Sequence, residues 1–186
     1  MTNNFSVSLI IPFYNSKKDI AKCIETIKSQ DMKEKVEIIF IDDCSQDNSA
    51  QIIKDFQLPN CNLLTLNRNQ GPSAARNKGL AKASGDYVFF LDVDDSLEFN
   101  ALSKLYEVAK KGNYDMVFCD KKRVTDGKNF RDKIFAFNSD KEFNIQDITL
   151  EIKKRVSDPE YTVGVAGCHG KLIKRSIIIE KNIYFE

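Results

Sequence analysis

Three carboxylates follow directly after an apolar run in FFLDVDDSLEFN, residues 89–100. Asp92, Asp94 and Asp95 repel one another and resist burial, so this position needs compensating positive charge nearby. If the segment stays extended, Asp92 and Asp94 point to one side and Asp95 to the other. A same-side pair of carboxylates at a rigid strand end suits a hard divalent cation, Mg²⁺ or Mn²⁺, that keeps positions open for phosphate oxygens. The alternative is a polar exit from a strand whose acids cap the following helix.

Other polar and aromatic residues follow the remaining apolar runs. In an open parallel sheet, ligands bind at the carboxyl ends of the strands, so these groups are expected to converge on one edge. A nucleoside diphosphate leaving group at that edge would complete the charge balance of the acids and a cation. The candidates after the first, second and third runs are Pro12, Tyr14 and Asn15, then Asp42 and Asp43, then Arg76 within NRNQGPSAARN.

Short apolar runs alternate with segments of helical periodicity, which predicts an α/β fold with a mostly parallel sheet covered on both faces. One helix start is predicted from the capping-box-like pair Ser16 and Asp19, and others at Asn48 or Ser49 and at Pro72. The predicted strands are 7–15, 36–43, 61–67, 86–92 and 114–120, and the predicted helices are 16–30, 49–56, 72–84 and 101–111.

The pattern changes after residue 120, where we expect a smaller, irregular and antiparallel region. Asp126-Gly127 signals a hairpin turn. Residues 147–156 look helical, and residues 163–179 can hold a loop, a short strand and a helix. The chain therefore divides into an α/β part, 1–120, and a second part, 121–186.

Composition excludes several classes of protein. The net charge of +1 gives no bulk attraction to nucleic acid or to an anionic membrane. Five scattered cysteines without a CxxC pair, and a single histidine, argue against a zinc site and suit small buried thiols in a reducing compartment. We find no signal peptide and no run long enough to span a bilayer, which predicts a cytoplasmic protein.

Four strings in order resemble the family 2 glycosyltransferases of the GT-A fold: SLIIPFYNSKKDIAKCIETIKSQ, IIFIDDCSQDNS, GPSAARNKGLAKASGDYVFFLDVDD and KLIKRSII. The likeness covers residues 6–120 closely and 163–185 loosely. It implies a GT-A domain with a Rossmann-like sheet, in which 1–120 is the nucleotide-sugar-binding half and 121–186 belongs to the acceptor side. It further implies metal-assisted, inverting transfer from a nucleotide sugar, with a UDP-sugar expected, to a glycan or lipid-linked acceptor, at the inner face of the membrane if further regions attach it there.

The resemblance also assigns roles to individual residues. Alternatives remain open at this point: Tyr14 as a half-buried core aromatic, Asp43 and Asp47 as helix caps, and Arg76 as a surface cation. At the nucleotide, the resemblance implies Pro12, Tyr14 and Asn15, with Tyr14 stacking on uracil, Asp42 accepting from the uracil N3–H and Arg76 reaching the base. In the acidic segment, it implies Asp94 as direct ligand of Mn²⁺ or Mg²⁺, Asp92 nearer the ribose and Asp95 facing the acceptor.

Family members use a carboxylate base that follows the segment resembling KLIKRSIIIEKNIYFE. We expect that base beyond Glu186, so that this chain binds donor without efficient transfer. Asp95 and His169 are weaker candidates within the chain, and His169 is also explained as a structural loop histidine.

Three other interpretations compete with a glycosyltransferase. FLDVDDSL fits a haloacid-dehalogenase-like phosphatase with Asp92 as nucleophile and Asp94 as acid/base, although that motif usually lies on the first strand. Asp42-Asp43 is similar to the acidic pair of a receiver domain, but the third predicted strand ends at Asn67 rather than at an aspartate. The last alternative is a nucleotide-sugar-binding module without turnover.

Overall fold

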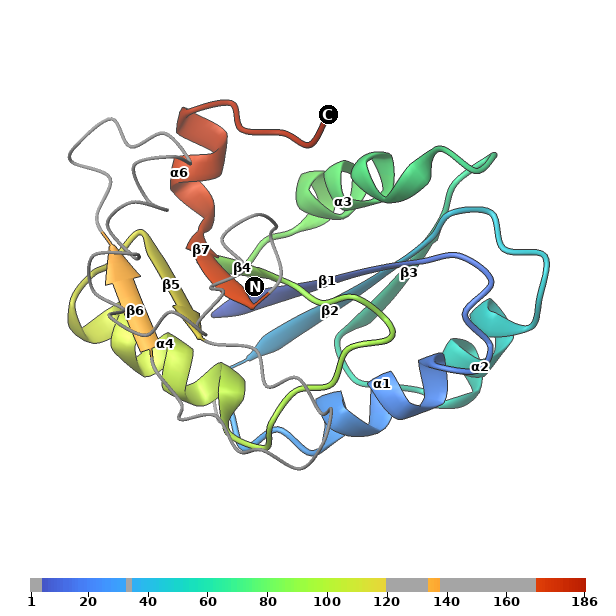
Figure 1. Ribbon diagram of the computed structural model, residues 1–186, viewed down its shortest axis with the longest axis horizontal. Coiled ribbons are helices and arrows are strands. Elements are labelled where there is room, and N and C mark those ends of the chain that lie inside the picture. The colour runs from blue at the N-terminus through green and yellow to red at the C-terminus, as the bar shows by residue number, and fades with distance from the viewer. Residues whose placement is uncertain (1–4, 33–34, 120–133, 138–169) are drawn as a thin grey trace, which may run out of the picture.

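The structure is a computed structural model, and it describes residues 5–32, 35–119, 134–137 and 170–186. Its strands form one seven-stranded sheet of order β3-β2-β1-β4-β7-β5-β6 in this part of the chain (Figure 1). The elements are β1 (Val7–Phe13), α1 (Ile20–Lys28), β2 (Val36–Asp42), α2 (Ser49–Asp55), β3 (Cys61–Thr65), α3 (Gly71–Lys82), β4 (Tyr87–Phe90), α4 (Ala101–Lys111), β5 (Met116–Cys119), β6 (Ile134–Phe137), β7 (Lys171–Lys174) and α6 (Arg175–Glu180).

Five of these strands run in the same direction. β1 pairs in parallel with β2 and β4, and β2 pairs in parallel with β3. β7 is antiparallel to both β4 and β5, so β5 runs with β4, whereas β6 is antiparallel to β5. The predicted mostly parallel α/β fold is therefore confirmed, with β7 of the second region lying between β4 and β5 of the first. The division at residue 120 stays a prediction.

Helices cover both faces of the sheet (Figure 1). Successive strand residues point to opposite faces, so Leu9 and Ile11 join one apolar cluster and Ile10 joins the other. The first cluster includes buried side chains of α1, α2 and α4, and the second includes those of α3 and α6. Near-continuous apolar strands are what burial on both faces requires.

Strand β2 holds helix α3 at both ends. Beyond the carboxyl end of β2, the Asp43 carboxylate accepts the Gln70 N–H at 2.7 Å and the Gly71 N–H at 2.8 Å, where α3 starts. At the amino end of β2, buried Glu37 accepts the Ser84 N–H at 2.9 Å just past the end of α3. Twelve residues of helix measure about 18 Å, and the six steps from Glu37 to Asp43 measure about 20 Å. The two lengths match, so the two carboxylates fix α3 along the strand.

The middle of α3 lies close to the sheet because Gly79 has no side chain. A Cβ at this position would lie 2.5 Å from Ile10 Cγ2 and 2.7 Å from Ile41 Cδ1. Real Cβ atoms do not approach other atoms that closely, so any larger residue must move the helix or the two isoleucines.

Two of the helix starts differ from the sequence-based expectation. Asp19 is the N-cap residue of α1 and Asn48 that of α2, but neither makes a side-chain capping bond. Asp47 instead accepts the Ser49 N–H at 3.0 Å at the start of α2. The alternative that Asp43 and Asp47 cap the next helix agrees with the structure for Asp47 only. Asp43 caps α3 instead of α2, since parallel strands bring the ends of β2 and β3 together.

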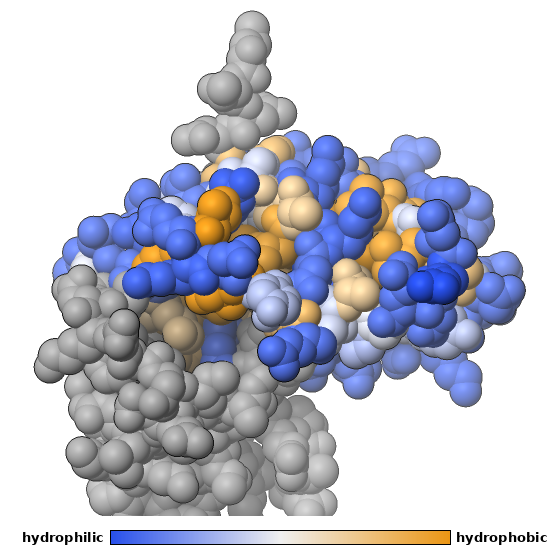
Figure 2. All heavy atoms as spheres, turned by 90° about the horizontal axis from the view of Figure 1, so that it is seen from above, coloured by the Kyte–Doolittle hydropathy of each residue, from blue (hydrophilic) through white to orange (hydrophobic). Residues whose placement is uncertain are grey.

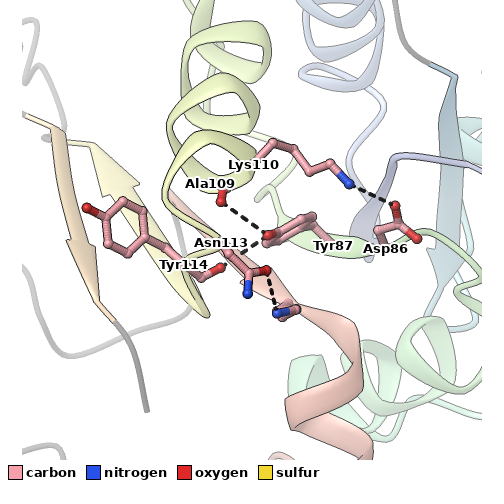
Figure 3. A network of polar contacts seen from close by, with 7 residues as sticks. Asp86, Tyr87, Ala109, Lys110, Asn113 and Tyr114 are labelled. Atoms are coloured by element: carbon pink, nitrogen blue, oxygen red, sulfur yellow. Dashed lines mark hydrogen bonds and ion pairs between the residues drawn. The ribbon is translucent and has the colours of Figure 1, made fainter. Parts of the chain in front are cut away.

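Polar contacts also join α4 to the outer part of the sheet (Figure 3). The Tyr87 hydroxyl lies 3.1 Å from the Tyr114 carbonyl oxygen and 3.4 Å from that of Ala109. Its single hydrogen can be donated to one of the two at a time. Burial raises the pKa of Tyr87, with smaller contributions from Tyr106 and neighbouring carboxylates. The chain entering the acidic segment through β4 is therefore held at its start by the end of α4.

Several sequence predictions lie outside the described residues. These are the hairpin turn at Asp126-Gly127, the helix at 147–156, and the positions of Cys168 and His169. The predicted short strand and helix within 163–179 correspond to β7 and α6. None of the helices in the described part of the chain is both long and apolar enough to cross a membrane.

We predict that Gly79→Ala lowers the free energy of unfolding by about 1–3 kcal/mol, the usual cost of overpacking. This loss should outweigh the gain in helix propensity, which is about 1 kcal/mol. Urea unfolding measures it, with exposed Lys78→Ala on the same helix as the control, expected within about 0.5 kcal/mol of the wild type. A stabilised Gly79→Ala protein would contradict the close packing of α3.

We predict that Asp43→Ala costs about 1–2 kcal/mol of unfolding free energy, because two N–H groups at the start of α3 lose their acceptor. Asp19→Ala is the matched control: it also removes an acid at a helix start, but one without a capping bond, and should cost about 0.5 kcal/mol or less. Equal losses in the two variants would show that the Asp43 bonds do not hold α3.

Candidate functional site

The loops that follow β1 and β2 are tied to each other. The Asn15 N–H donates to Ser45 Oγ at 2.9 Å, and Asn15 Oδ1 accepts the Gln46 N–H at 2.7 Å. Asp47 accepts the Lys17 N–H at 3.0 Å. Burial alone would raise the pKa of Asp47, but bonds from the Ser49 hydroxyl and amide, with the Lys17 amide and charge, lower it. Together with Asp43, these bonds bring the loops after β1, β2 and β3 to one edge, here named the carboxyl edge, as predicted.

Pro12 marks where the carboxyl edge opens between β1 and β4. Ile10 faces β4, since its carbonyl accepts the Leu91 N–H at 3.0 Å, and Phe13 faces β2, since its carbonyl accepts the Asp43 N–H. Alternation therefore turns the nitrogen of Pro12 toward β4, whose pairing with β1 ends at Ile10–Phe90. A proline is tolerated in this strand because no ladder partner is left at that point.

Tyr14 follows at the surface. Its side chain is 45% exposed, whereas Phe13 beside it is buried in the core. The structure thus does not place Tyr14 as a core aromatic, and an exposed ring at the carboxyl edge can stack on a planar ligand. The next residue, Asn15, has a positive φ of 48°, and its side-chain amide oxygen accepts the Gln46 N–H.

Asp42 ends β2 and is buried, with 4% of its surface exposed. Its Oδ1 accepts the Ser45 N–H at 2.8 Å, which shapes the loop after β2. Within the described residues Oδ2 has no hydrogen-bond partner, so this carboxylate can still accept from an N–H group of a ligand.

The acidic segment forms a turn. β4 ends at Phe90, and the Asp95 N–H donates to the Asp92 carbonyl at 3.0 Å, which closes the acidic turn, residues 92–95. The expectation of an extended segment with Asp92 and Asp94 on one side is therefore wrong, because pairing with β1 has already ended at Phe90. Asp94 is exposed at this turn, and Asp92 and Asp95 are partly buried.

Arg76 supplies the positive charge that the acidic turn needs. Its Nη2 lies 2.9 Å from Asp92 Oδ1, and only 13% of its side chain is exposed against 30% for Asp92. Arg76 comes from α3, so the placement of that helix by Asp43 and Glu37 decides whether the pair forms. The sequence resemblance expected Arg76 at the base; here the guanidinium lies against the carboxylate expected near the ribose.

The oxygen donors at the acidic turn fit a hard divalent cation. No group of three or more His, Cys, Asp or Glu side chains able to hold a metal occurs in the described part of the chain. Asp94 and Asp92 thus provide a partial set of ligands, and a bound Mn²⁺ or Mg²⁺ would need phosphate or water oxygens as well.

A buried thiol lies behind this turn. Burial, with smaller contributions from Asp95 and Asp94, raises the pKa of the Cys23 thiol to about 12. Cys23 is therefore neutral and adds no negative charge to the acids. It behaves as a small buried residue, as expected, whereas Cys44 and Cys61 are only partly buried.

Phe185 was missed in the sequence, and Asn77 was noted beside Arg76 with its role left open between donor contact and scaffold. Asn77, next to Arg76 on α3, forms two hydrogen bonds with the backbone of Phe185. The Arg76 guanidinium lies 5.7 Å from the centroid of the Phe185 ring. No sequence signal links residues 108 positions apart. Glu186, the expected near neighbour of a catalytic base, is exposed beyond them.

Comparison with solved structures places this arrangement in a known fold. TarS residues 1–349 from S. aureus in complex with UDP superposes with a TM-score of 0.72 over 97% of this chain and 50% of that chain, at 24% identity. The mannosyltransferase PcManGT from Pyrobaculum calidifontis, in complex with GDP-Man and Mn²⁺, gives a TM-score of 0.68 over 100% of this chain and 48% of that chain, at 20% identity. Both support a GT-A glycosyltransferase fold.

Curated relatives agree with the fold. A poly(ribitol-phosphate) beta-glucosyltransferase of Bacillus spizizenii is 32% identical over 183 residues, which cover 96% of this chain and 26% of that protein. A GalNAc(5)-diNAcBac-PP-undecaprenol beta-1,3-glucosyltransferase of Campylobacter jejuni is 39% identical over 115 residues, covering 60% of this chain and 37% of that protein. The chain thus spans about a quarter to a third of these relatives.

The sequence model of one family covers nearly the whole chain. It extends over residues 8–180 and so includes the loops after β1, β2 and β3 that form the carboxyl edge, together with the acidic turn and its Arg76 partner. Fold, relatives and family model lead to the same conclusion: the chain belongs to glycosyl transferase family 2.

Proposed function

We propose that this domain transfers a sugar from a UDP-sugar to a hydroxyl of a glycan or lipid-linked acceptor, with inversion and with the help of Mn²⁺ or Mg²⁺. The observation that carries the proposal is the acidic turn held against Arg76 at the carboxyl edge. Solved neighbours with UDP and with GDP-Man and Mn²⁺ support a nucleotide sugar and a divalent cation. The names of the Bacillus and Campylobacter relatives support a glycan or lipid-linked acceptor, and a lipid-linked one would bring the reaction to a membrane face.

The residues at the carboxyl edge divide the donor between them in this proposal. Tyr14 offers an exposed ring to the uracil, and Asp42 Oδ2 accepts its N3–H. Pro12 and Asn15 shape the loop beneath the nucleotide. Arg76 and Asp92 hold the ribose and diphosphate side, where the guanidinium attracts phosphate oxygens and the carboxylate accepts from a ribose hydroxyl.

Asp94 is the exposed carboxylate that would hold the cation, with Asp92 as a second oxygen donor. When bound, the cation neutralises charge that develops on the departing diphosphate. The Asp95 N–H donates to the Asp92 carbonyl and thereby orders the acidic turn. These residues orient the anomeric carbon for in-line attack by the acceptor hydroxyl, which gives inversion.

A base must take the proton of the acceptor hydroxyl. It is proposed to lie in the region that follows Glu186 in longer relatives, with Asp95 and His169 as the weaker candidates in this chain. The phosphatase interpretation loses support, because Asp92 is paired with Arg76 and the acidic turn follows β4 rather than the first strand. The receiver-domain interpretation does not explain the family match over residues 8–180.

We predict that UDP binds at least about tenfold more weakly when Mn²⁺ is removed with EDTA, a loss of about 1.4 kcal/mol. Asp94→Ala should bind UDP equally with and without Mn²⁺, because the exposed ligand of the cation is gone. Calorimetric titration measures both. Glu98→Ala, which removes another exposed acid nearby, is the control and should keep the metal dependence. Equal UDP affinity of the wild type in Mn²⁺ and in EDTA would contradict the metal role. Hydrolysis of p-nitrophenyl phosphate by the wild type, lost in Asp92→Asn, would favour the phosphatase interpretation.

We predict that Tyr14→Ala weakens UDP binding by about 1–3 kcal/mol, the usual range for losing a ring that stacks on a base. The wild type should also prefer UDP to GDP and ADP, because Asp42 needs an N–H at the position of uracil N3. Phe99→Ala, another exposed aromatic, is the control and should change nothing. Unchanged affinity in Tyr14→Ala would remove Tyr14 from the base pocket.

A further inference from the structure

Asn77 pairs with the backbone of Phe185 as a strand residue would. Its Nδ2 donates to the Phe185 carbonyl at 2.8 Å, and its Oδ1 accepts the Phe185 N–H at 2.9 Å. The two bonds define the orientation of the amide, because the nitrogen must face the carbonyl and the oxygen the N–H. Both polar groups of one peptide residue are thereby satisfied by a single side chain on α3.

This pairing holds the last part of the described chain over α3 (Figure 1). After α6, backbone bonds continue only as far as the Ile183 N–H, which donates to the Ile178 carbonyl at 2.9 Å. Ile183 and Tyr184 are more than half exposed. Beyond Ile183, the Asn77 amide supplies the hydrogen bonds that the described residues make to this segment.

The Phe185 ring contacts both the sheet and the guanidinium of Arg76. Its centroid is 5.0 Å from that of Phe90, at an interplanar angle of 76°, and Arg76 Cζ lies 5.7 Å from it. The ring is thus in contact with the last residue of β4, and the Arg76 guanidinium lies over the ring. An arginine beside an aromatic ring is attracted to it and is shielded from water.

That shielding matters for the pair with Asp92. An ion pair open to solvent contributes little and is screened by salt, whereas a pair covered by apolar groups interacts more strongly and in one geometry. Arg76 Nε is already buried and has no hydrogen-bond partner. The position of the guanidinium therefore depends on Asp92 and on the covering ring. The surface seen from above in Figure 2 is largely hydrophilic, with apolar side chains in patches among charged ones.

We propose that Asn77 is a positioning residue for donor binding: it holds Phe185 over Arg76, so that the guanidinium stays against Asp92 and faces the diphosphate of the nucleotide. The proposal rests on the proposed function for the identity of the ligand. In this proposal Asn77 does not contact the nucleotide sugar itself and acts through Phe185 and Arg76. The Asn77 amide offers both the donor and the acceptor that this pairing needs, whereas a carboxylate lacks the donor and alanine lacks both.

The test is a double-mutant cycle on UDP binding in the presence of Mn²⁺, with Asn77→Ala, Arg76→Ala and the double variant. Asn77→Ala should weaken binding about five- to tenfold, which is about 1.0–1.4 kcal/mol. In the Arg76→Ala background the same change should cost nothing further, because the residue through which Asn77 acts is absent. Additive losses, or unchanged affinity in Asn77→Ala, would overturn the proposal.

Three further variants separate positioning from general stability. Phe185→Leu keeps the backbone pairing and removes the ring, so it should weaken UDP binding as Asn77→Ala does and show the same coupling to Arg76. Asn77→Asp should bind UDP at least as weakly as Asn77→Ala does, since the new carboxylate cannot donate to the Phe185 carbonyl and is repelled by it. Lys82→Ala, on an exposed position of the same helix, is the control and should bind as the wild type does. Full UDP affinity in Phe185→Leu would contradict the role of the ring.

Hydrogen exchange gives a readout that needs no ligand. The Phe185 amide and the Arg76 guanidinium Nε–H should exchange slowly in the wild type and faster in Asn77→Ala, while the free energy of unfolding of the core changes little. If the wild-type chain binds no nucleotide, the proposed function fails, and this exchange measurement alone decides the positioning of Arg76. Unchanged exchange at Arg76 in Asn77→Ala would then overturn it.

Discussion

Two buried carboxylates, one near each end of strand β2, fix the position of helix α3 along the sheet. The site depends on that position. Glu37 and Asp43 lie at the two ends of β2 and accept N–H groups just past the end and at the start of α3. Gly79 lets the middle of the helix approach the strands. Because α3 is held at both ends, Arg76 has a defined position beside the carboxyl end of β4, where it pairs with Asp92.

The same position of α3 solves an electrostatic problem. Acids at 92, 94 and 95 repel one another, and a protein interior tolerates them only with compensating charge. Arg76 neutralises one of them from the side of α3, and Cys23 stays neutral behind them. Asp94 is left exposed. Under the proposed function a cation and a diphosphate would arrive together, since each offsets the charge that the other brings.

Much of this could be predicted from local patterns. Apolar runs bounded by polar residues indicated the parallel strands, and the polar residues after them indicated the carboxyl edge. Features that depend on distant partners could not be predicted. The turn at 92–95 forms because pairing with β1 stops at Phe90, β7 enters between β4 and β5 from far along the chain, and Asn77 meets Phe185 across 108 positions. The expected capping box of Ser16 and Asp19 is not observed, since the Ser16 hydroxyl donates to the Tyr14 carbonyl and Asp19 makes no capping bond. Asn48 makes no capping bond either, because local propensity does not decide which acceptor reaches a helix start.

We propose that the acidic turn, Arg76 and the loops after β1 and β2 together form a site for a metal-bound nucleoside diphosphate. A crystal structure of the protein with UDP and Mn²⁺, with anomalous data collected for manganese, tests it most directly. The account predicts a manganese peak at the Asp94 carboxylate, the diphosphate between that peak and Arg76, and the uracil ring beside Tyr14 with its N3–H on Asp42. Manganese away from the acidic turn, or UDP bound elsewhere on the molecule, would contradict it.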